Sequence, residues 1–164
     1  MPPTDKVLIA FYDGWENYQK QLTKAVTQLT PELLTTHVTP DLRTIGQILT
    51  HLIAVRVRWF HEAAGAGGSD VAPIGTWDRP DSPPHTLAEL VAGLETSWQL
   101  IRHALDTWTP DELSTPYELV LVYHPEKETF TRQWIVWHVI EHDLHHGGEL
   151  SLALGINHLP GIDI

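Results

Sequence analysis

The amino-acid sequence predicts an all-α fold, a bundle of four helices of about 20 residues each. Two observations carry this prediction. In three segments the apolar residues recur every three or four positions, an interval that keeps them on one face of a helix, and in a fourth His138, His142 and His146 repeat every four positions. Stretches rich in Gly and Pro separate these segments, and Pro cannot continue a helix interior. With 164 residues, the chain is expected to form a single domain over residues 1–164.

Two helices are predicted in the N-terminal half. The first covers residues 7–29, and its apolar side chains lie three or four positions apart. Pro31, in the segment TPELL, interrupts this pattern. The second helix begins after Thr44, a residue type that accepts a hydrogen bond from the first helical turn, and it continues to about Ala64.

A long connection and a third helix follow. Residues 65–85 are rich in Gly and Pro and have no period. One reason for such a length is geometric, because parallel neighbouring helices need a crossover whereas antiparallel neighbours need only a short turn. The third helix opens with a capping box of Thr86 and Glu89, and its apolar face extends to Trp108.

The C-terminal third is expected to contain a short extended segment and the fourth helix. Residues 117–131 include β-branched and aromatic residues around a polar turn, which predicts a small hairpin or an extended loop. The fourth helix covers about residues 132–154, and Gly155 is a natural stop. Gly147 and Gly148 each cost about 1 kcal/mol relative to Ala in a helix interior. Either the helix breaks there, or another backbone or a ligand comes close.

Composition excludes several classes of function. The formal net charge is −11 and the ten Lys and Arg residues are scattered singly, so nucleic acid is not expected as a partner. The absence of Cys excludes disulfides, thiolate metal ligands and a cysteine nucleophile. The segment MPPTDK lacks the apolar core of a secretory signal, and no run approaches the ~18 apolar residues of a membrane span. We therefore expect a cytoplasmic protein with no membrane partner.

The segment WHVIEHDLHHGGEL, residues 137–150, holds four of the eleven histidines and is the main candidate for a functional site. His142 and His146 lie one helical turn apart on nearly the same face, so both imidazoles can approach one metal ion. A third ligand must come from another segment. His51 is the leading candidate, because it stands in an apolar helix, where a buried imidazole needs a polar partner.

The spacing alone leaves other assignments open. His145 could replace His146, and His138 could add a ligand one turn earlier. Three protein nitrogens with open positions fit a catalytic site, whereas four ligands fit a structural one. The ordinary alternative is that each histidine is a hydrogen-bonded or half-exposed side chain that binds no metal.

Three carboxylates near these histidines are candidates for supporting roles. Glu141, Asp143 and Glu149 could each accept a hydrogen bond from the second ring nitrogen of a ligating histidine and fix its tautomer. The alternative is that these carboxylates are solvated charges on the helix surface. We expect this role for Asp143 and, after it, for Glu141. In a hydrolytic mechanism, Glu149 would instead serve as the general base.

These motifs resemble those of the DinB family, the DinB/YfiT-like metalloenzymes. The segment WHVIEHDLHHGGELSLAL is similar to the family's final-helix pattern of histidines followed by Gly, and LTHLIAV is similar to the segment that carries its first ligand. The resemblance covers nearly the whole chain. It implies an up-down-down-up bundle with residues 65–85 as the crossover, and a His₃ metal site of His51, His142 and His146 with open positions.

The resemblance also implies a function. Better-understood members use low-molecular-weight thiols such as bacillithiol or mycothiol, which implies a small-molecule transferase with Zn²⁺ by default, or Ni²⁺, Fe²⁺ or Mn²⁺. It further implies a homodimer. The alternatives are a metal-dependent hydrolase and a non-catalytic stress- or damage-response protein that binds a metal or a small molecule. The chain departs from the family at Gly147, where many members have a basic residue, and at Glu149, where Gln is frequent.

Overall fold

The computed structural model describes residues 6–121 and 124–163. Most of them are helical, as the sequence predicts. The long helices are α1 (Lys6–Val26), α2 (Ile45–Val57), α3 (Leu87–Thr107) and α5 (Arg132–Ile156). The shorter elements are the 3-10 helices η1 (Leu33–Thr35) and η3 (Ala72–Thr76), the π-helix η2 (Arg58–Ala63), α4 (Pro110–Ser114), and the strands β1 (Tyr117–Leu121) and β2 (His124–Phe130). No helix in this described part of the chain is long and apolar enough to cross a membrane.

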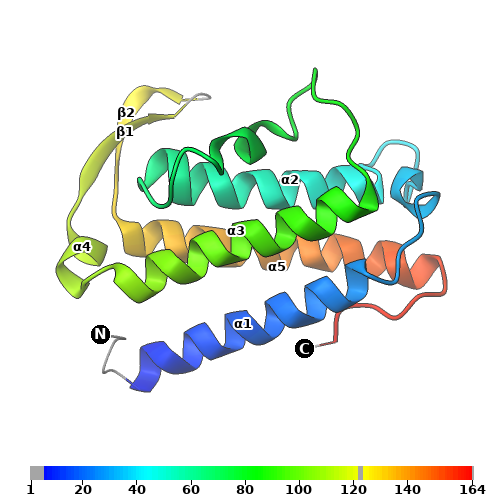
Figure 1. The fold of residues 1–164 in the computed structure, drawn as a ribbon, viewed down its shortest axis with the longest axis horizontal. Coiled ribbons are helices and arrows are strands. Elements are labelled where there is room, and N and C mark those ends of the chain that lie inside the picture. The colour runs from blue at the N-terminus through cyan, green and yellow to red at the C-terminus, as the bar shows by residue number, and fades with distance from the viewer. Residues whose placement is uncertain (1–5, 122–123, 164) are drawn as a thin grey trace.

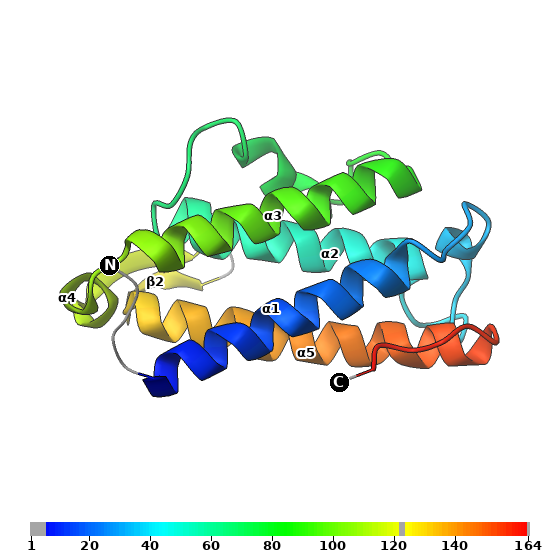
Figure 2. The same ribbon diagram turned by 60° about the horizontal axis from the view of Figure 1, so that its bottom comes forward.

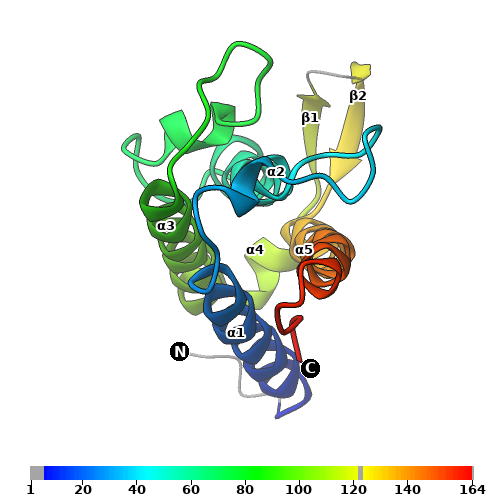
Figure 3. The same cartoon turned by 90° about the vertical axis from the view of Figure 1, so that its right-hand side faces the viewer.

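The long helices lie side by side (Figure 1). In this view the chain runs from left to right through α1 and α5, and from right to left through α2 and α3. Helix α2 contacts both α3 and α5, and α1 contacts α3. Seen from the end, α1 lies opposite α2 (Figure 3). Two clusters of buried apolar side chains fill the space between the helices.

The connection between α2 and α3 returns along α2. Because these two helices run in the same direction, the chain must travel back before α3 can begin (Figures 1 and 2). On the way it forms η3, which packs against α2 and η2. This path places polar residues of the connection, Asp78 among them, beside α2.

Local sequence signals locate several helix ends. Thr86 Oγ1 accepts a hydrogen bond from the Glu89 backbone N–H, and the Glu89 carboxylate accepts one from the Thr86 backbone N–H, so the predicted capping box is confirmed. Thr44 caps α2, as predicted, in a second box with Gln47. Beyond α2 the chain continues as the π-helix η2, so this helical segment ends close to its predicted position. Helix α1 ends at Val26, three residues before its predicted end.

The predicted stop signal of the last helix is wrong. Gly155 does not stop α5, which continues to Ile156. Asn157 follows, and its side-chain amide donates a hydrogen bond to the carbonyl oxygen of Ala153. The left-handed backbone position is His158, with a φ of 60°. A polar side chain that bonds back to the last turn, and not a glycine, therefore closes this helix.

The segment between α4 and α5 is a hairpin, one of the two structures expected there. Strands β1 and β2 are antiparallel, with Tyr117 opposite Phe130 and Leu119 opposite Glu128. Residues 122 and 123 of the expected turn lie outside the described residues. Phe130 is buried against Trp59 of η2, so the hairpin is packed onto the helices.

Arg56 of α2 and Asp143 of α5 form a fully buried ion pair. Arg56 Nη2 lies 2.7 Å from Asp143 Oδ2, and Arg56 Nε lies 2.9 Å from Asp143 Oδ1. The indole N–H of Trp15 donates to the same carboxylate, and Gln19 Oε1 accepts from Arg56. The expectation that Asp143 is a solvated surface charge is therefore wrong. A carboxylate is fully buried only when it is paired, and its partner here lies 87 residues away in the sequence.

The glycine pair does not break α5. Gly147 is covered by Tyr18 of α1, whose hydroxyl would lie 1.6 Å from a Cβ atom placed on Gly147. That hydroxyl donates a hydrogen bond to the backbone carbonyl of Asp143 at 3.1 Å, which holds the two helices at this close distance. Gly148 has no atom within 4 Å of such a Cβ, and nothing in the structure explains a glycine there.

Gly147→Ala should destabilise the protein, because the added methyl group needs the space of the buried Tyr18 hydroxyl, and such overpacking costs about 1–3 kcal/mol. Gly148→Ala is the matched control in the same helix. It should stabilise the protein by up to about 1 kcal/mol, because Ala favours a helix more than Gly does. Urea unfolding followed by circular dichroism measures both values, and equal effects would contradict the described packing of α1 on α5.

Asp143→Ala should lower the free energy of unfolding by about 3–5 kcal/mol, because the Arg56 guanidinium then stays buried without its counter-charge. The double variant Arg56→Met with Asp143→Ala should recover part of this loss, since it leaves no buried charge. Urea unfolding of the wild type, both single variants and the double variant gives the coupling energy. Purely additive losses would show that the pair is not an energetic unit.

Candidate metal centre

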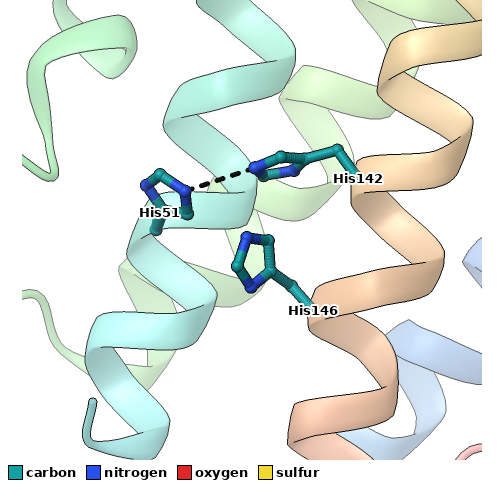
Figure 4. Close-up of side chains that lie close together, drawn as sticks. All are labelled: His51, His142 and His146. Atoms are coloured by element: carbon teal, nitrogen blue, oxygen red, sulfur yellow. Dashed lines mark hydrogen bonds between the residues drawn. The ribbon is translucent and has the colours of Figure 1, made fainter. Parts of the chain in front are cut away.

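Three histidines from two helices point toward one another between α2 and α5 (Figure 4). His51 belongs to α2, whereas His142 and His146 lie on successive turns of α5. The Nε2 atoms of His51 and His142 are 3.2 Å apart. The ring centroid of His146 lies 4.8 Å from that of His51 and 4.3 Å from that of His142. The structure thus brings together the three histidines that the sequence singles out as metal ligands.

Asp78 holds His51 from the outer side. Its Oδ2 atom lies 2.7 Å from His51 Nδ1, which leaves the Nε2 atom of that ring directed at the other histidines. Two guanidinium nitrogens of Arg58 donate hydrogen bonds to the same carboxylate, at 2.5 and 2.9 Å. Burial raises the pKa of Asp78, but the hydrogen bonds from His51 and Arg58 outweigh burial and hold it well below its usual range. Asp78 is therefore a carboxylate at neutral pH and fixes the Nδ1–H tautomer of His51.

Glu149 holds His146 in the same manner. Its Oε2 atom lies 2.7 Å from His146 Nδ1, which is the supporting contact expected of this carboxylate. Glu141, the other carboxylate considered from the sequence, is exposed and lies 3.6 Å from Nδ1 of His138. Its expected role as a surface charge therefore agrees with the structure.

The central histidines favour the neutral form. Burial, followed by the repulsion of His146 and His51, lowers the pKa of His142 to about 2. Burial also lowers the pKa of His146, although the hydrogen bond that its ring donates to Glu149 opposes this effect. Neutral imidazole is the form that binds metal ions, so the environment prepares both rings as ligands without a proton to displace.

The remaining histidines of the segment lie outside this cluster. His138 stacks on Trp134, and its ring centroid is 6.3 Å from that of His142. His145 is 68% exposed, and its Nε2 atom is 3.6 Å from Glu149 on the outer side of the helix. His145, His146 and Glu149 together form a second group of neighbouring ligand atoms, but a more exposed one. The geometry therefore favours His51, His142 and His146.

Sequence reasoning missed Asp78 and Arg58. Asp78 stands in the connection of residues 65–85, where no periodicity predicts which side chains face a helix. The only signal was the unusual length of that connection, because long loops without regular structure often carry functional residues. The contact between Asp78 and His51 spans 27 positions and depends on the path of the whole segment.

These imidazoles suit a divalent metal ion. Two nitrogens bound to one tetrahedral Zn²⁺ ion at about 2.0–2.1 Å are about 3.3 Å apart. The Nε2 atoms of His51 and His142 match this spacing. His142 Nδ1 is buried and has no hydrogen-bond partner among the described residues. Unlike His51 and His146, this ring therefore has no carboxylate on its outer nitrogen, and its Nε2 atom is the one directed at the other imidazoles.

The helical fold and the three converging imidazoles place this chain among helical proteins with a candidate His₃ metal centre. The family comparison is more specific. Residues 1–155 match the DinB family, and the chain therefore belongs to that family. The resemblance inferred from the histidine motifs is thereby confirmed.

Similarity to a solved structure supports the fold. A DinB-like protein from Bacillus cereus ATCC 10987 has a TM-score of 0.73 and 18% sequence identity with this chain. The match covers 94% of this chain and 95% of that one. At this identity the similarity concerns the fold alone. A comparison with curated proteins found no match.

Asp78→Asn should weaken Zn²⁺ binding by about 10–100-fold, the usual effect of removing a carboxylate that orients a ligating histidine. Asp81→Asn is the matched control, because Asp81 is an exposed carboxylate of the same connection. Competition with a chromogenic chelator measures both affinities. Equal affinity in the two variants would show that Asp78 does not act on the metal through His51.

Proposed function

We propose that this protein is a metal-dependent enzyme in which His51, His142 and His146 hold one divalent ion. The observation that carries the proposal is the convergence of three imidazoles, two of them oriented by carboxylates on their outer nitrogens. Three protein ligands leave coordination positions open for a substrate, as in catalytic rather than structural sites. Membership in the DinB family supports this assignment.

The reaction that fits best is group transfer between a low-molecular-weight thiol and a small electrophile. A bound divalent ion would supply a Lewis acid that lowers the pKa of the thiol. The chain has no Cys of its own, so the sulfur nucleophile would come from a second substrate. Zn²⁺ is the default ion for a donor set of neutral imidazoles, with Ni²⁺, Fe²⁺ and Mn²⁺ as alternatives.

The residues around the histidines have separate tasks. Asp78 accepts a hydrogen bond from His51 Nδ1–H, and Glu149 accepts one from His146 Nδ1–H. Both Nε2 lone pairs are thereby directed inward. Arg58 holds Asp78 in place and balances its charge. Because Asp78 comes from the connection between α2 and α3, that connection is part of the site.

Hydrolysis through a metal-activated water is the competing reaction. It needs a carboxylate free to act as general base, and Glu149 was the candidate. In the structure Glu149 already accepts a hydrogen bond from His146 at 2.7 Å. This engagement favours a positioning role for Glu149, and so favours thiol transfer over hydrolysis.

We also propose that the four long helices form an up-down-down-up bundle. The helix directions in Figure 1 and the return path of the connection between α2 and α3 support this topology. The arrangement places α2 beside α5, the two helices that carry the histidines.

Protein purified without a histidine tag should contain about one divalent metal ion per chain, because three neutral imidazoles form one site. His142→Ala should lose this metal and any thiol-dependent turnover of electrophilic test substrates. His145→Ala is the matched control, since His145 is the exposed neighbour on the same helix. Elemental analysis and a panel of thiols with electrophiles make the measurements.

Each alternative gives a different result in this experiment. Turnover that depends on metal but not on thiol would indicate the hydrolase. Stoichiometric metal without turnover in any combination would indicate a binding protein. Metal content unchanged by His142→Ala would remove the proposed site altogether.

A further inference from the structure

A groove between α1 and α5 lies on the side of α5 that faces away from the three histidines. Its volume of about 490 Å³ is within the range of about 300–1,000 Å³ usual for small-molecule sites. Trp15 and Tyr18 are buried at its floor, whereas Trp137 and Leu144 stand at its rim, 58% and 48% exposed. We propose that this groove binds an uncharged, largely apolar small molecule.

The lining determines the chemical class of the ligand. Ten residues of the described part of the chain line the groove, and none of them is charged, although the chain carries a net charge of −11. The polar groups of Trp15 and Tyr18 already donate hydrogen bonds to Asp143. A ligand would therefore bind mainly by burying apolar surface, and among the described lining residues it would find no cation to balance an anionic group.

Gly14 is a glycine of α1 at the groove. It lies inside α1, where a glycine costs about 1 kcal/mol relative to Ala. A Cβ atom on Gly14 would meet no atom within 4 Å, and its φ is not in the left-handed region, so neither packing nor backbone conformation requires a glycine. Gly14 lines the groove, and a larger side chain would occupy it.

The floor of the groove is preformed. Trp15 donates its indole N–H to the Asp143 carboxylate at 2.9 Å, and Tyr18 donates its hydroxyl to the Asp143 carbonyl oxygen at 3.1 Å. Asp143 is itself fixed by the buried Arg56. These bonds hold both aromatic rings in place, so the groove does not have to form when a ligand enters, and binding costs less ordering entropy.

A small molecule fits this groove better than a second copy of the chain does. A stable interface of standard size uses about 20–30 residues on each side, whereas ten residues line the groove in the part of the chain that the structure describes. Its hollow shape also leaves a buried floor that a flat helical surface would not fill. A second copy is therefore an outcome that the experiment has to distinguish.

The test uses N-phenyl-1-naphthylamine, an uncharged apolar probe that fluoresces in apolar surroundings, with its anionic relative 1-anilinonaphthalene-8-sulfonate for comparison. The full chain should bind the uncharged probe saturably, at about one molecule per chain, and more tightly than the anionic probe. Gly14→Leu should weaken this binding about tenfold or more, because its side chain fills the groove. Gly155→Leu is the matched control at an exposed helical glycine outside the groove.

Circular dichroism melting checks that each variant is folded, and Ile140→Glu provides a second test by placing a charge in the lining. Loss of binding in Gly14→Leu and Ile140→Glu, with binding retained in Gly155→Leu, supports the proposal. Unsaturable binding, or binding unchanged by Gly14→Leu, overturns it. Light scattering measures the oligomeric state. If the wild type is a dimer, Gly14→Leu is a monomer and neither form binds the probe, the groove holds a second copy of the chain and the proposal is overturned.

Discussion

The buried pair of Arg56 and Asp143 fixes how α2 and α5 face one another. Arg56 lies five residues after His51 on α2, and Asp143 lies between His142 and His146 on α5. Because both charges are fully buried, a rotation of either helix would leave a charge without its partner, at a cost of several kcal/mol. The same constraint keeps the three imidazoles directed at one point. A structural pair in the core thus sets the geometry of the neighbouring site.

The site itself is organised from its outer side. Asp78 and Glu149 bind the outer nitrogens of His51 and His146, so the inner nitrogens are available and correctly oriented. His142 has no such support from the described residues, and burial is the main cause that keeps it neutral. One supporting carboxylate comes from the ligand-bearing helix, whereas the other comes from the long connection that returns along α2. The loop that the topology requires also completes the site.

Helix α5 serves two different environments at once. One face presents His142 and His146 to α2, and the opposite face lines the apolar groove with α1. Asp143 lies between them, accepting hydrogen bonds from Trp15 on the groove side and from Arg56 of α2. The exposed face of α5 carries the large apolar residues Trp137, Leu144 and Leu152, whereas the polar Asp143 and His146 are buried, which explains why its apolar residues follow no single stripe.

Local spacing in the sequence was enough to predict the helices, the capping box of Thr86 and the shared face of His142 with His146, because these depend on contacts within a few residues. The third ligand, His51, followed from an imidazole in an apolar helix and from the family resemblance. Only the tertiary structure decided that Asp143 is buried and that Asp78 supports His51. Both contacts join residues far apart in the chain, and whether a carboxylate is solvated or buried depends on a partner that no local pattern identifies.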